Sequence, residues 1–343
     1  MRNLSVRSRV LTIVTILALA GLAPLVAGCG EEATTSSASP SASAASPSPS
    51  AAASWTASDL AAITTDSALT ALLPADIQSA GEIKCLSDIP YPPWEYFDPP
   101  DSTNPAGFDY DLSQALGKKL GVTVKFIDTP FDSILLAIKA GKGDIVLSGM
   151  YDNRERQDAG YSFVDYTFDG TGILVAKGNP SGITNLDSLA GKTVTVESGA
   201  TQQGVLEELN KQFAAAGKPE MTIQAVQSQP EALLKVKGGT AVADLTDWST
   251  ALNIAATTNE GNTYEVVRDP AAPYLPQMDG IAMLTKNTQL VDAIQKALQA
   301  LIDEGAYQKI VAAWGFVPVE SAQVNAGPAY AASHPGVATS PSP

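Results

Sequence analysis

Two side chains near the middle of the chain could bind a small anion. Arg156 lies in a short charged run, and its planar guanidinium can hold a carboxylate through two parallel hydrogen bonds, although a surface arginine is the simpler alternative. Thr201 follows a Ser-Gly pair at the start of a predicted helix, where free backbone N–H groups attract anions. Thr201 could equally act as a helix cap, and the two roles are compatible.

The sequence contains little that supports catalysis or cofactor binding. Its only histidine, His334, lies in a Ser/Pro/Gly-rich tail, so neither a Ser-His-Asp triad nor a histidine-ligated zinc ion is expected inside the folded part. The glycines within residues 141–143 precede a predicted strand and lack the third glycine of a dinucleotide-binding loop. No Walker lysine and no Gly-x-Ser-x-Gly motif occurs. We therefore expect no metal, no cofactor and no enzymatic activity.

Composition and charge narrow the class of partner. The 343 residues are 45% hydrophobic and 17% charged, which is typical of a globular protein and at this length favours two domains. Acidic residues outnumber basic residues by 36 to 21, so the formal net charge is −15. A field of this sign repels nucleic acid phosphates and anionic lipid headgroups. We therefore expect no nucleic acid partner.

Residues 1–28 have the order of a bacterial signal peptide. Arg2, Arg7 and Arg9 precede an uncharged, mostly apolar stretch over residues 10–27 that ends in small residues. An uncleaved membrane anchor is the alternative, but the stretch is short for a membrane span and contains a glycine and a proline.

The end of this stretch suggests lipidation. Residues 25–29 read Leu-Val-Ala-Gly-Cys, which resembles the bacterial lipobox, so Cys29 would begin the mature chain and carry a diacylglycerol. Several acyl chains, palmitate among them, anchor a protein stably where one chain would be marginal. We expect a lipid-anchored protein on the extracytoplasmic face of the cell membrane.

The flanks of the predicted folded region differ from it in composition. Residues 29–54 consist almost entirely of Ser, Ala, Thr and Pro, which cannot bury enough apolar surface to fold, so this segment is predicted to be a disordered tether. Residues 55–81 form a predicted helical lead-in. Residues 320–343 resemble the tether in composition and are predicted to be a disordered tail.

Between the flanks the chain alternates β-rich runs with helical patterns. This order predicts an α/β fold of parallel sheets covered by helices, with ligands bound at the carboxyl ends of strands. Cys85 lies in the first such run, where a buried structural thiol is expected. Strands are predicted over residues 83–86, 123–127, 144–147, 172–176, 193–197, 222–226, 241–244 and 280–284, and helices over residues 108–120, 132–140, 201–216, 230–237, 247–257, 290–304 and 307–314.

Four segments, taken in order, carry a family resemblance. The first segment has two parts: residues 88–95 read Asp-Ile-Pro-Tyr-Pro-Pro-Trp-Glu, and residues 107–112 read Gly-Phe-Asp-Tyr-Asp-Leu. The other three are the run at residues 143–150 followed by Arg156, the run at residues 189–201, and the closing helix at residues 305–315. Their order and spacing resemble the polar amino acid class of ABC-transporter substrate-binding proteins, also called extracellular solute-binding protein family 3.

The resemblance implies the type II periplasmic-binding-protein-like fold, in which two α/β lobes joined by two hinge crossings close around a small ligand. Lobe 1 would comprise residues 82–169 plus 280–316, and lobe 2 residues 173–267, with the crossings near Thr171 and residues 267–280. The implied function is the lipid-anchored substrate-binding component of an ABC importer, a monomer that captures a polar amino acid or related zwitterion and delivers it to permease subunits.

The same resemblance assigns the two charged ends of the ligand. Arg156 and Thr201 would bind the carboxylate, and Asp247 corresponds to the aspartate that binds the ammonium group. Asp244 is the rival for this role, and helix capping is the alternative for Asp247. Gly149 would offer its carbonyl to the ammonium group.

The ligand side chain has its own candidate contacts. Tyr91, Phe131 and Trp94 occupy positions that contact or stack on it in the family, although each could instead belong to the core. Asp88 would point toward the cleft and bind a polar or cationic group.

One motif departs from the family pattern. Tyr151, Asp152 and Asn153 stand where the family usually has Ser-Ile-Thr. The phenol of Tyr151 could shorten the pocket. Asp152 would favour a cationic ligand if it faced the cleft, and would balance Arg154 if it were exposed.

Two other functions on the same fold stay open. A dehydratase of the cyclohexadienyl dehydratase type resembles these binding proteins and would need a general acid, for which Glu95 or Asp88 is the candidate. A sensory lipoprotein is the third alternative.

Overall fold

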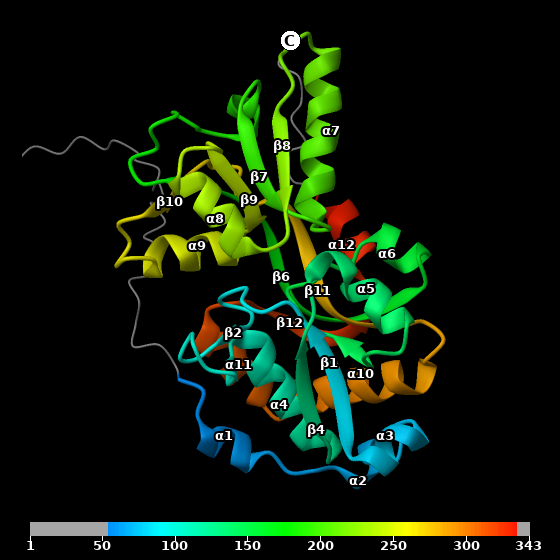
Figure 1. Cartoon of the computed structure of the whole chain (residues 1–343). Coiled ribbons are helices and arrows are strands. Elements are labelled where there is room, and N and C mark those ends of the chain that lie inside the picture. Colours follow the sequence, from blue (N-terminus) through cyan, green and yellow to red (C-terminus); the bar gives the residue numbers. More distant parts are fainter. Residues whose placement is uncertain (1–53, 335–343) are drawn as a thin grey trace, which may run out of the picture. The chain divides into compact units, whose positions relative to one another are not determined.

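The computed structural model describes residues 54–334 (Figure 1). Cys29, the predicted signal peptide, the tether up to residue 53 and the last nine residues of the chain lie outside the described residues. Within residues 54–334, no helix has the length and hydropathy that crossing a membrane requires.

The described chain begins with three short helices, α1 (Ala57–Ala62), α2 (Ser67–Thr70) and α3 (Ala75–Ala80). Side chains of this lead-in, with Ile63, Leu73 and Ile77 the most buried, pack into the first hydrophobic core. Asp66 caps α2 by accepting hydrogen bonds from two backbone N–H groups.

The first core is built on a parallel group of strands. β1 (Glu82–Ser87) pairs with β4 (Thr123–Asp128) on one side and with β5 (Ile145–Val146) on the other. The helices around it are α4 (Phe108–Leu120), α5 (Phe131–Lys139), α10 (Thr288–Asp303) and α11 (Ala306–Trp314). Cys85 in β1 is fully buried, as expected, and burial raises the pKa of its thiol well above the ordinary value.

The start of α4 requires a glycine. Gly107 precedes the helix with φ of +123°, and a Cβ atom there would lie 2.2 Å from the backbone oxygen of Trp94. The chain therefore passes close to the Trp94 backbone before it enters α4. A small antiparallel pair, β2 (Tyr96–Phe97) and β3 (Pro105–Ala106), closes this loop.

The second core repeats the parallel arrangement. β7 (Thr193–Glu197) pairs with β8 (Thr222–Val226) and with β9 (Ala243–Asp247), both in parallel. The helices that follow these strands are α7 (Thr201–Ala215), α8 (Gln229–Lys237) and α9 (Trp248–Thr257), and the 3-10 turn η1 (Leu186–Leu189) precedes β7.

Two long antiparallel strands connect the two cores. β6 (Tyr161–Ala176) pairs with β11 (Tyr274–Leu284) along its first part and with β9 and β10 (Tyr264–Val266) along its second part (Figure 1). Hydrogen bonds therefore join the strands of both cores along one path, β4-β1-β5-β11-β6-β9-β7-β8, and β10 pairs with β6 beside this path. Within each core the strands pair in parallel, as predicted, whereas the crossing strands β6 and β11 pair antiparallel and join the two parallel groups.

Sequence patterning missed most of β6 for a physical reason. The strand is buried on both faces along nearly its whole length, so it shows no alternation of polar and apolar residues. Its buried aspartates, Asp165 and Asp169, also lower its apparent β propensity.

The prediction of a disordered tail over residues 320–343 is wrong for residues 320–334. β12 (Val317–Val324) pairs antiparallel with β6, and α12 (Gly327–Ser333) follows it. The segment is ordered because Val319 and Ala322 are buried in the first core and the Tyr330 ring packs on Phe168, with centroids 4.7 Å apart. Residues 335–343 lie outside the described residues.

Candidate functional site

A small cavity lies where strands of the second core end and helices begin. β7 ends at Glu197 before α7, and β9 ends at Asp247 before α9, so both strands present their carboxyl ends to it. Its volume is about 10 Å³, roughly the space of one water molecule. The residues around it are Tyr91, Phe131, Gly149, Arg156, Glu197, Ala200, Thr201, Gln202 and Asp247.

The cation at this cavity is Arg156, in α6 (Arg154–Asp158). Its Nη1 donates to the carbonyl of Tyr151 at 2.8 Å, and its Nη2 donates to the carbonyl of Gly199 at 3.4 Å. Its guanidinium carbon lies 5.6 Å from the centroid of the Phe131 ring, and the side chain is buried. Burial lowers the pKa of Arg156 to about 10, so the group keeps its charge at neutral pH.

The anion at this cavity is Asp247. Its Oδ1 accepts a hydrogen bond from Gln202 Nε2 at 2.7 Å, and its Oδ2 accepts one from the Tyr91 hydroxyl at 2.9 Å. Burial raises the pKa of Asp247 to about 6, and hydrogen bonds from its neighbours with the field of Arg156 limit this rise. The group is therefore ionised at pH 7. The rival, Asp244, lies deeper, where its Oδ2 accepts from Gln229 Nε2 at 2.7 Å.

Two further carboxyl groups make one side of the site acidic. Glu197 lines the cavity and is 7% exposed, and Asp88 lies next to it, accepting a hydrogen bond from the Phe131 backbone N–H at 3.0 Å. Burial raises the pKa of both, that of Asp88 to about 6; the charge of Asp88 raises the pKa of Glu197 further, whereas hydrogen bonds from the Phe131 backbone and from Glu197 limit the rise at Asp88. A cation placed beside these carboxyl groups would favour their ionised forms.

Sequence reasoning missed Glu197 and Gln202. Glu197 is the last residue of a predicted strand, where ligand contacts are common in α/β folds, so its position carried a usable signal. Gln202 follows Thr201 and reaches Asp247 only because α7 begins beside the end of β9. That proximity depends on the fold and leaves no trace in the sequence.

Some of the predicted site residues do not line the cavity. Trp94 is fully buried in the first core, where its Nε1 donates to Thr250 Oγ1 at 3.1 Å and its ring packs on Phe316. Tyr151 is 2% exposed and borders the site through its carbonyl, which holds Arg156. Asp88 does not line the cavity itself, but its carboxyl group contacts two residues that do, Phe131 and Glu197.

Asp152 takes neither of the two places expected for it. It is 1% exposed, so it does not balance Arg154 at the surface, and it is not among the described residues around the cavity. Its Oδ1 accepts from Gln157 Nε2 at 2.7 Å and its Oδ2 from the Gly327 backbone N–H at 2.8 Å. The sequence could not predict this position, because Gly327, which binds the Asp152 side chain, lies 175 residues further along the chain.

Contacts between the two halves of the fold close the cavity. The Tyr91 hydroxyl lies 2.8 Å from Thr246 Oγ1 and also bonds Asp247, while Asn153 Nδ2 lies 3.4 Å from Thr201 Oγ1. Gly199, with φ of +79°, passes so near α5 that a Cβ atom would lie 2.9 Å from the Cα of Asp132. An amino acid can enter only if these contacts separate, since the present space holds about one water.

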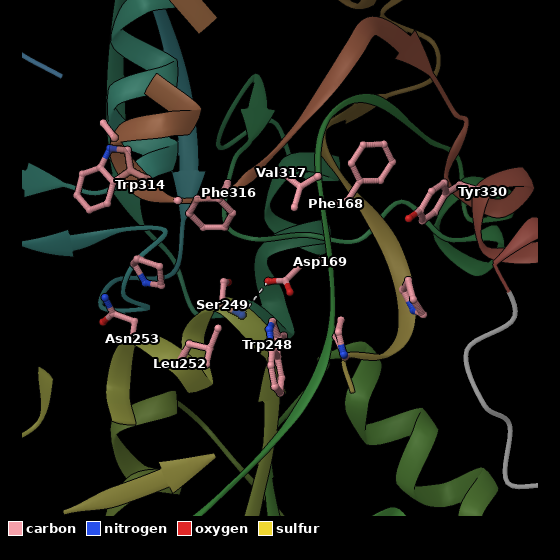
Figure 2. Close-up of a pocket in the computed structure, with 15 residues that line it drawn as sticks. Phe168, Asp169, Trp248, Ser249, Leu252, Asn253, Trp314, Phe316, Val317 and Tyr330 are labelled. Atoms are coloured by element: carbon pink, nitrogen blue, oxygen red, sulfur yellow. Dashed lines mark hydrogen bonds between the residues drawn. The ribbon is translucent and has the colours of Figure 1, made fainter. Parts of the chain in front are cut away.

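A second, larger cavity of about 890 Å³ has a different chemistry. Figure 2 shows its aromatic rings, Phe168, Trp248, Trp314, Phe316 and Tyr330, around a single carboxyl group, Asp169, which accepts a hydrogen bond from the Ser249 backbone N–H at 3.2 Å. No lysine or arginine lies among the described residues around it. It therefore lacks the paired opposite charges that a buried zwitterion needs, and the smaller cavity is the better candidate.

No cluster of three or more His, Cys, Asp or Glu side chains suited to a metal ion occurs within residues 54–334.

The strand order, the two long crossing strands and the charged cavity at the strand ends define a class of protein. These are the features of the two-lobed type II periplasmic-binding-protein fold, as predicted. The sequence profile of bacterial extracellular solute-binding proteins, family 3, matches residues 83–317, and the chain belongs to this family. It is therefore an extracytoplasmic substrate-binding protein of the kind that serves ABC transporters.

Individual relatives agree with this assignment. The ABC transporter arginine-binding protein 1 of Escherichia coli K12 is 28% identical over 250 residues, which cover 72% of this chain and 96% of that protein. A solved structure of an ancestral arginine-binding protein bound to glutamine is 32% identical, with a TM-score of 0.58, and the match covers 68% of this chain and 97% of that one. An ancestral amino acid-binding protein, a precursor of cyclohexadienyl dehydratase, is 29% identical with a TM-score of 0.56, covering 70% of this chain and 97% of that one.

The buried acids predict that the protein is more stable in mildly acidic than in alkaline buffer. Burial raises the pKa of Asp109 and Asp244 to about 7 and that of Asp165 and Asp169 to about 8, all from 3.8. The folded state then binds more protons than the unfolded state between about pH 4 and 8, so stability is lost as pH rises through this window. We expect the free energy of unfolding in urea to fall by at least about 1.4 kcal/mol, one pKa unit, from pH 5 to pH 8.

The control for this experiment is Asp165→Asn, which removes one raised pKa and keeps an oxygen to accept from the Ala326 N–H. The variant should show a shallower pH dependence than the unaltered chain. Constant or rising stability from pH 5 to pH 8 would contradict the prediction.

Proposed function

We propose that the small cavity binds an α-amino acid with a cationic side chain, arginine being the first candidate, for import by an ABC transporter. One observation carries the proposal: Arg156 and Asp247, opposite charges that are both buried, line the same small cavity. A zwitterion buried without charged partners would lose most of its affinity to desolvation, and this pair can satisfy both of its ends.

The ligand carboxylate is assigned to Arg156 and Thr201. Arg156 would keep Nη1 on the carbonyl of Tyr151 and turn Nη2 from the carbonyl of Gly199 toward the carboxylate, which is the stronger acceptor. Thr201 lies at the start of the 15-residue helix α7, whose first N–H groups favour an anion.

The ligand ammonium group is assigned to Asp247, with the Gly149 carbonyl as a second acceptor. Both oxygens of Asp247 already accept hydrogen bonds from neutral donors, so the carboxylate is held in place before a ligand arrives. An ammonium group would replace or add to these donors with a charged one, which strengthens the interaction.

The cationic side chain is assigned to the acidic side of the cavity. Glu197 and Asp88 repel each other when both are ionised, and a guanidinium group between them removes that cost. Phe131 offers a ring face on which a planar guanidinium can stack, as it now does for Arg156. The arginine-binding relatives support the same ligand class.

Ligand binding would close the two predicted lobes, residues 82–169 plus 280–316 and residues 173–267. The separate hydrophobic cores around β1 and β7 support this division. Arg156 comes from one lobe and Asp247 from the other, so a ligand that touches both stabilises the closed form. The closed, monomeric protein would then dock on the permease subunits of the importer.

A dehydratase is the second candidate, favoured by the likeness to the dehydratase precursor. Neither Glu95 nor Asp88 supports it as a general acid here. Glu95 is fully buried and accepts a hydrogen bond from Ser148 Oγ at 2.6 Å, and neither side chain is among the described residues around the cavity. We therefore infer that the protein binds its ligand and does not transform it.

Replacing either charged partner should nearly abolish binding. Arg156→Ala or Asp247→Asn would leave one charge of the buried zwitterion unpaired, at a cost of roughly 2 to 5 kcal/mol. Titration calorimetry with L-arginine and L-glutamine measures the loss. Arg154→Ala is the matched control, because Arg154 lies on the same helix and is exposed. Near wild-type affinity in both site variants would show that the zwitterion binds elsewhere.

Replacing Glu197 should change which amino acid is preferred. Glu197→Gln keeps the shape of the side chain and removes its charge, so L-arginine should lose roughly 1.5 to 3 kcal/mol of binding free energy while L-glutamine loses little. Glu208→Gln, on the exposed surface of α7, is the control. An equal loss for both amino acids would contradict an acidic subsite, while leaving the zwitterion assignment intact.

We further propose that the chain is anchored to the membrane through a lipid on Cys29. The lipobox-like Leu-Val-Ala-Gly-Cys at residues 25–29 supports this proposal. Cys29→Ser should leave an uncleaved leader or release the protein from the membrane fraction, as judged by mass spectrometry and fractionation. Cys85→Ser, at the other cysteine, should leave membrane attachment unchanged. Normal processing and attachment of the Cys29 variant would disprove lipidation at this residue.

A further inference from the structure

The C-terminal segment Val317–Ser333, formed by β12 and α12, lies against the loop that precedes α6, the helix of Arg156. The family profile ends at residue 317, so nearly all of this segment lies beyond it. At the turn between β12 and α12, the Ala326 N–H donates to Asp165 Oδ2 at 2.9 Å and the Gly327 N–H donates to Asp152 Oδ2 at 2.8 Å. Asn325 adds a third link, because its Oδ1 accepts from the Phe163 N–H at 2.8 Å.

The contact at Gly327 leaves no room for a side chain. A Cβ atom on Gly327 would lie 2.1 Å from the backbone oxygen of Asp152 and 2.7 Å from its Cβ atom. Gly327 itself is buried. The approach of the two backbones therefore depends on glycine at this position, and any larger residue must push them apart.

Asp152 is held on three sides. Its backbone N–H donates to the Met278 carbonyl in β11 at 2.8 Å, and its two side-chain oxygens accept from Gln157 and Gly327. None of these partners is among the described residues around the ligand cavity. Asp152 therefore links the loop to the crossing strand and to the C-terminal segment.

The two neighbours of Asp152 hold Arg156. The carbonyl of Tyr151 accepts a hydrogen bond from Arg156 Nη1 at 2.8 Å. The side chain of Asn153 caps α6 by accepting from the Arg156 backbone N–H at 2.9 Å. A shift of Asp152 would thus move both the guanidinium and the helix from which Arg156 projects.

We infer that the segment Val317–Ser333 is a positioning element for ligand recognition: Gly327 holds Asp152, and Asp152 holds Arg156 in the orientation that meets the ligand carboxylate. This inference rests on the proposed function, because it assigns Arg156 to the ligand. It gives a role to the Tyr-Asp-Asn sequence at residues 151–153, in which Asp152 serves as the acceptor for Gly327 and the outer residues hold the arginine.

The variant that tests this is Gly327→Ala, with Gly204→Ala as the matched control. A Cβ atom on Gly204 would meet nothing within 4 Å, and its φ is not in the left-handed region. We expect Gly327→Ala to raise the dissociation constant of L-arginine about tenfold in titration calorimetry, and Gly204→Ala to leave it unchanged. If Gly327→Ala does not fold, a truncated chain that ends at Ala326 serves in its place, because it also lacks the contact between Gly327 and Asp152.

A purely structural role is separated by a double-mutant cycle with Arg156→Lys. If Gly327 acts through Arg156, its substitution should have a clearly smaller effect on the dissociation constant when Arg156→Lys is already present. Effects that multiply independently, or a lower melting temperature with unchanged affinity, would overturn the inference.

Hydrogen exchange of the protein without ligand decides the inference even if no amino acid binds. Gly327→Ala should accelerate exchange of the Asp152 and Arg156 amides at least tenfold, and Gly204→Ala should not. Unchanged exchange at these amides in both the Gly327→Ala chain and the chain ending at Ala326 would overturn the inference. Failure of the unaltered chain to bind L-arginine or L-glutamine would instead refute the proposed function.

Discussion

The guanidinium of Arg156 is buried, and a buried charge must be surrounded by groups that compensate for the lost water. Here the compensation comes from two carbonyls, an aromatic face and the fields of Asp247 and Asp279. These groups belong to a loop, a glycine turn, a helix and two strands, so they meet only when both halves of the fold are in place. Much of the site's architecture follows from this requirement.

The acids that provide this compensation are themselves costly to bury. Asp279 is fully buried and is repelled by the charges of Asp247, Asp169 and Asp109. Neither of its carboxyl oxygens has a hydrogen-bond partner among the described residues. Burial and this repulsion raise its pKa well above the ordinary value. Such a concentration of carboxyl groups is typical of a site that is built for a charged ligand at some expense of stability.

Size alone would have selected the larger of the two cavities. The larger one is lined mostly by aromatic and proline side chains and contains the single carboxyl group of Asp169 (Figure 2). The smaller one holds opposite charges fixed by hydrogen bonds, and only rearrangement of the contacts between Tyr91, Thr246 and Asp247 can enlarge it. Charge arrangement makes the smaller cavity the better candidate, because a zwitterion needs two compensating charges more than it needs preformed space.

The sequence alone determined the alternation of strands and helices, and with it the positions of Thr201 and Asp247 just after predicted strands, while Arg156 was identified from the family motif. These are local properties, since period, turn residues and caps are read over a few neighbouring positions. Together with the family motifs they were enough to bring Tyr91, Phe131 and Gly149 to the same cavity. Only the tertiary structure decided that Trp94 belongs to the core, that Gln202 lines the cavity, and that residues 317–333 are ordered. Those outcomes depend on pairings between distant segments, such as Gly327 with Asp152 and β12 with β6, and a pairing of this kind leaves no pattern in the residues around either partner.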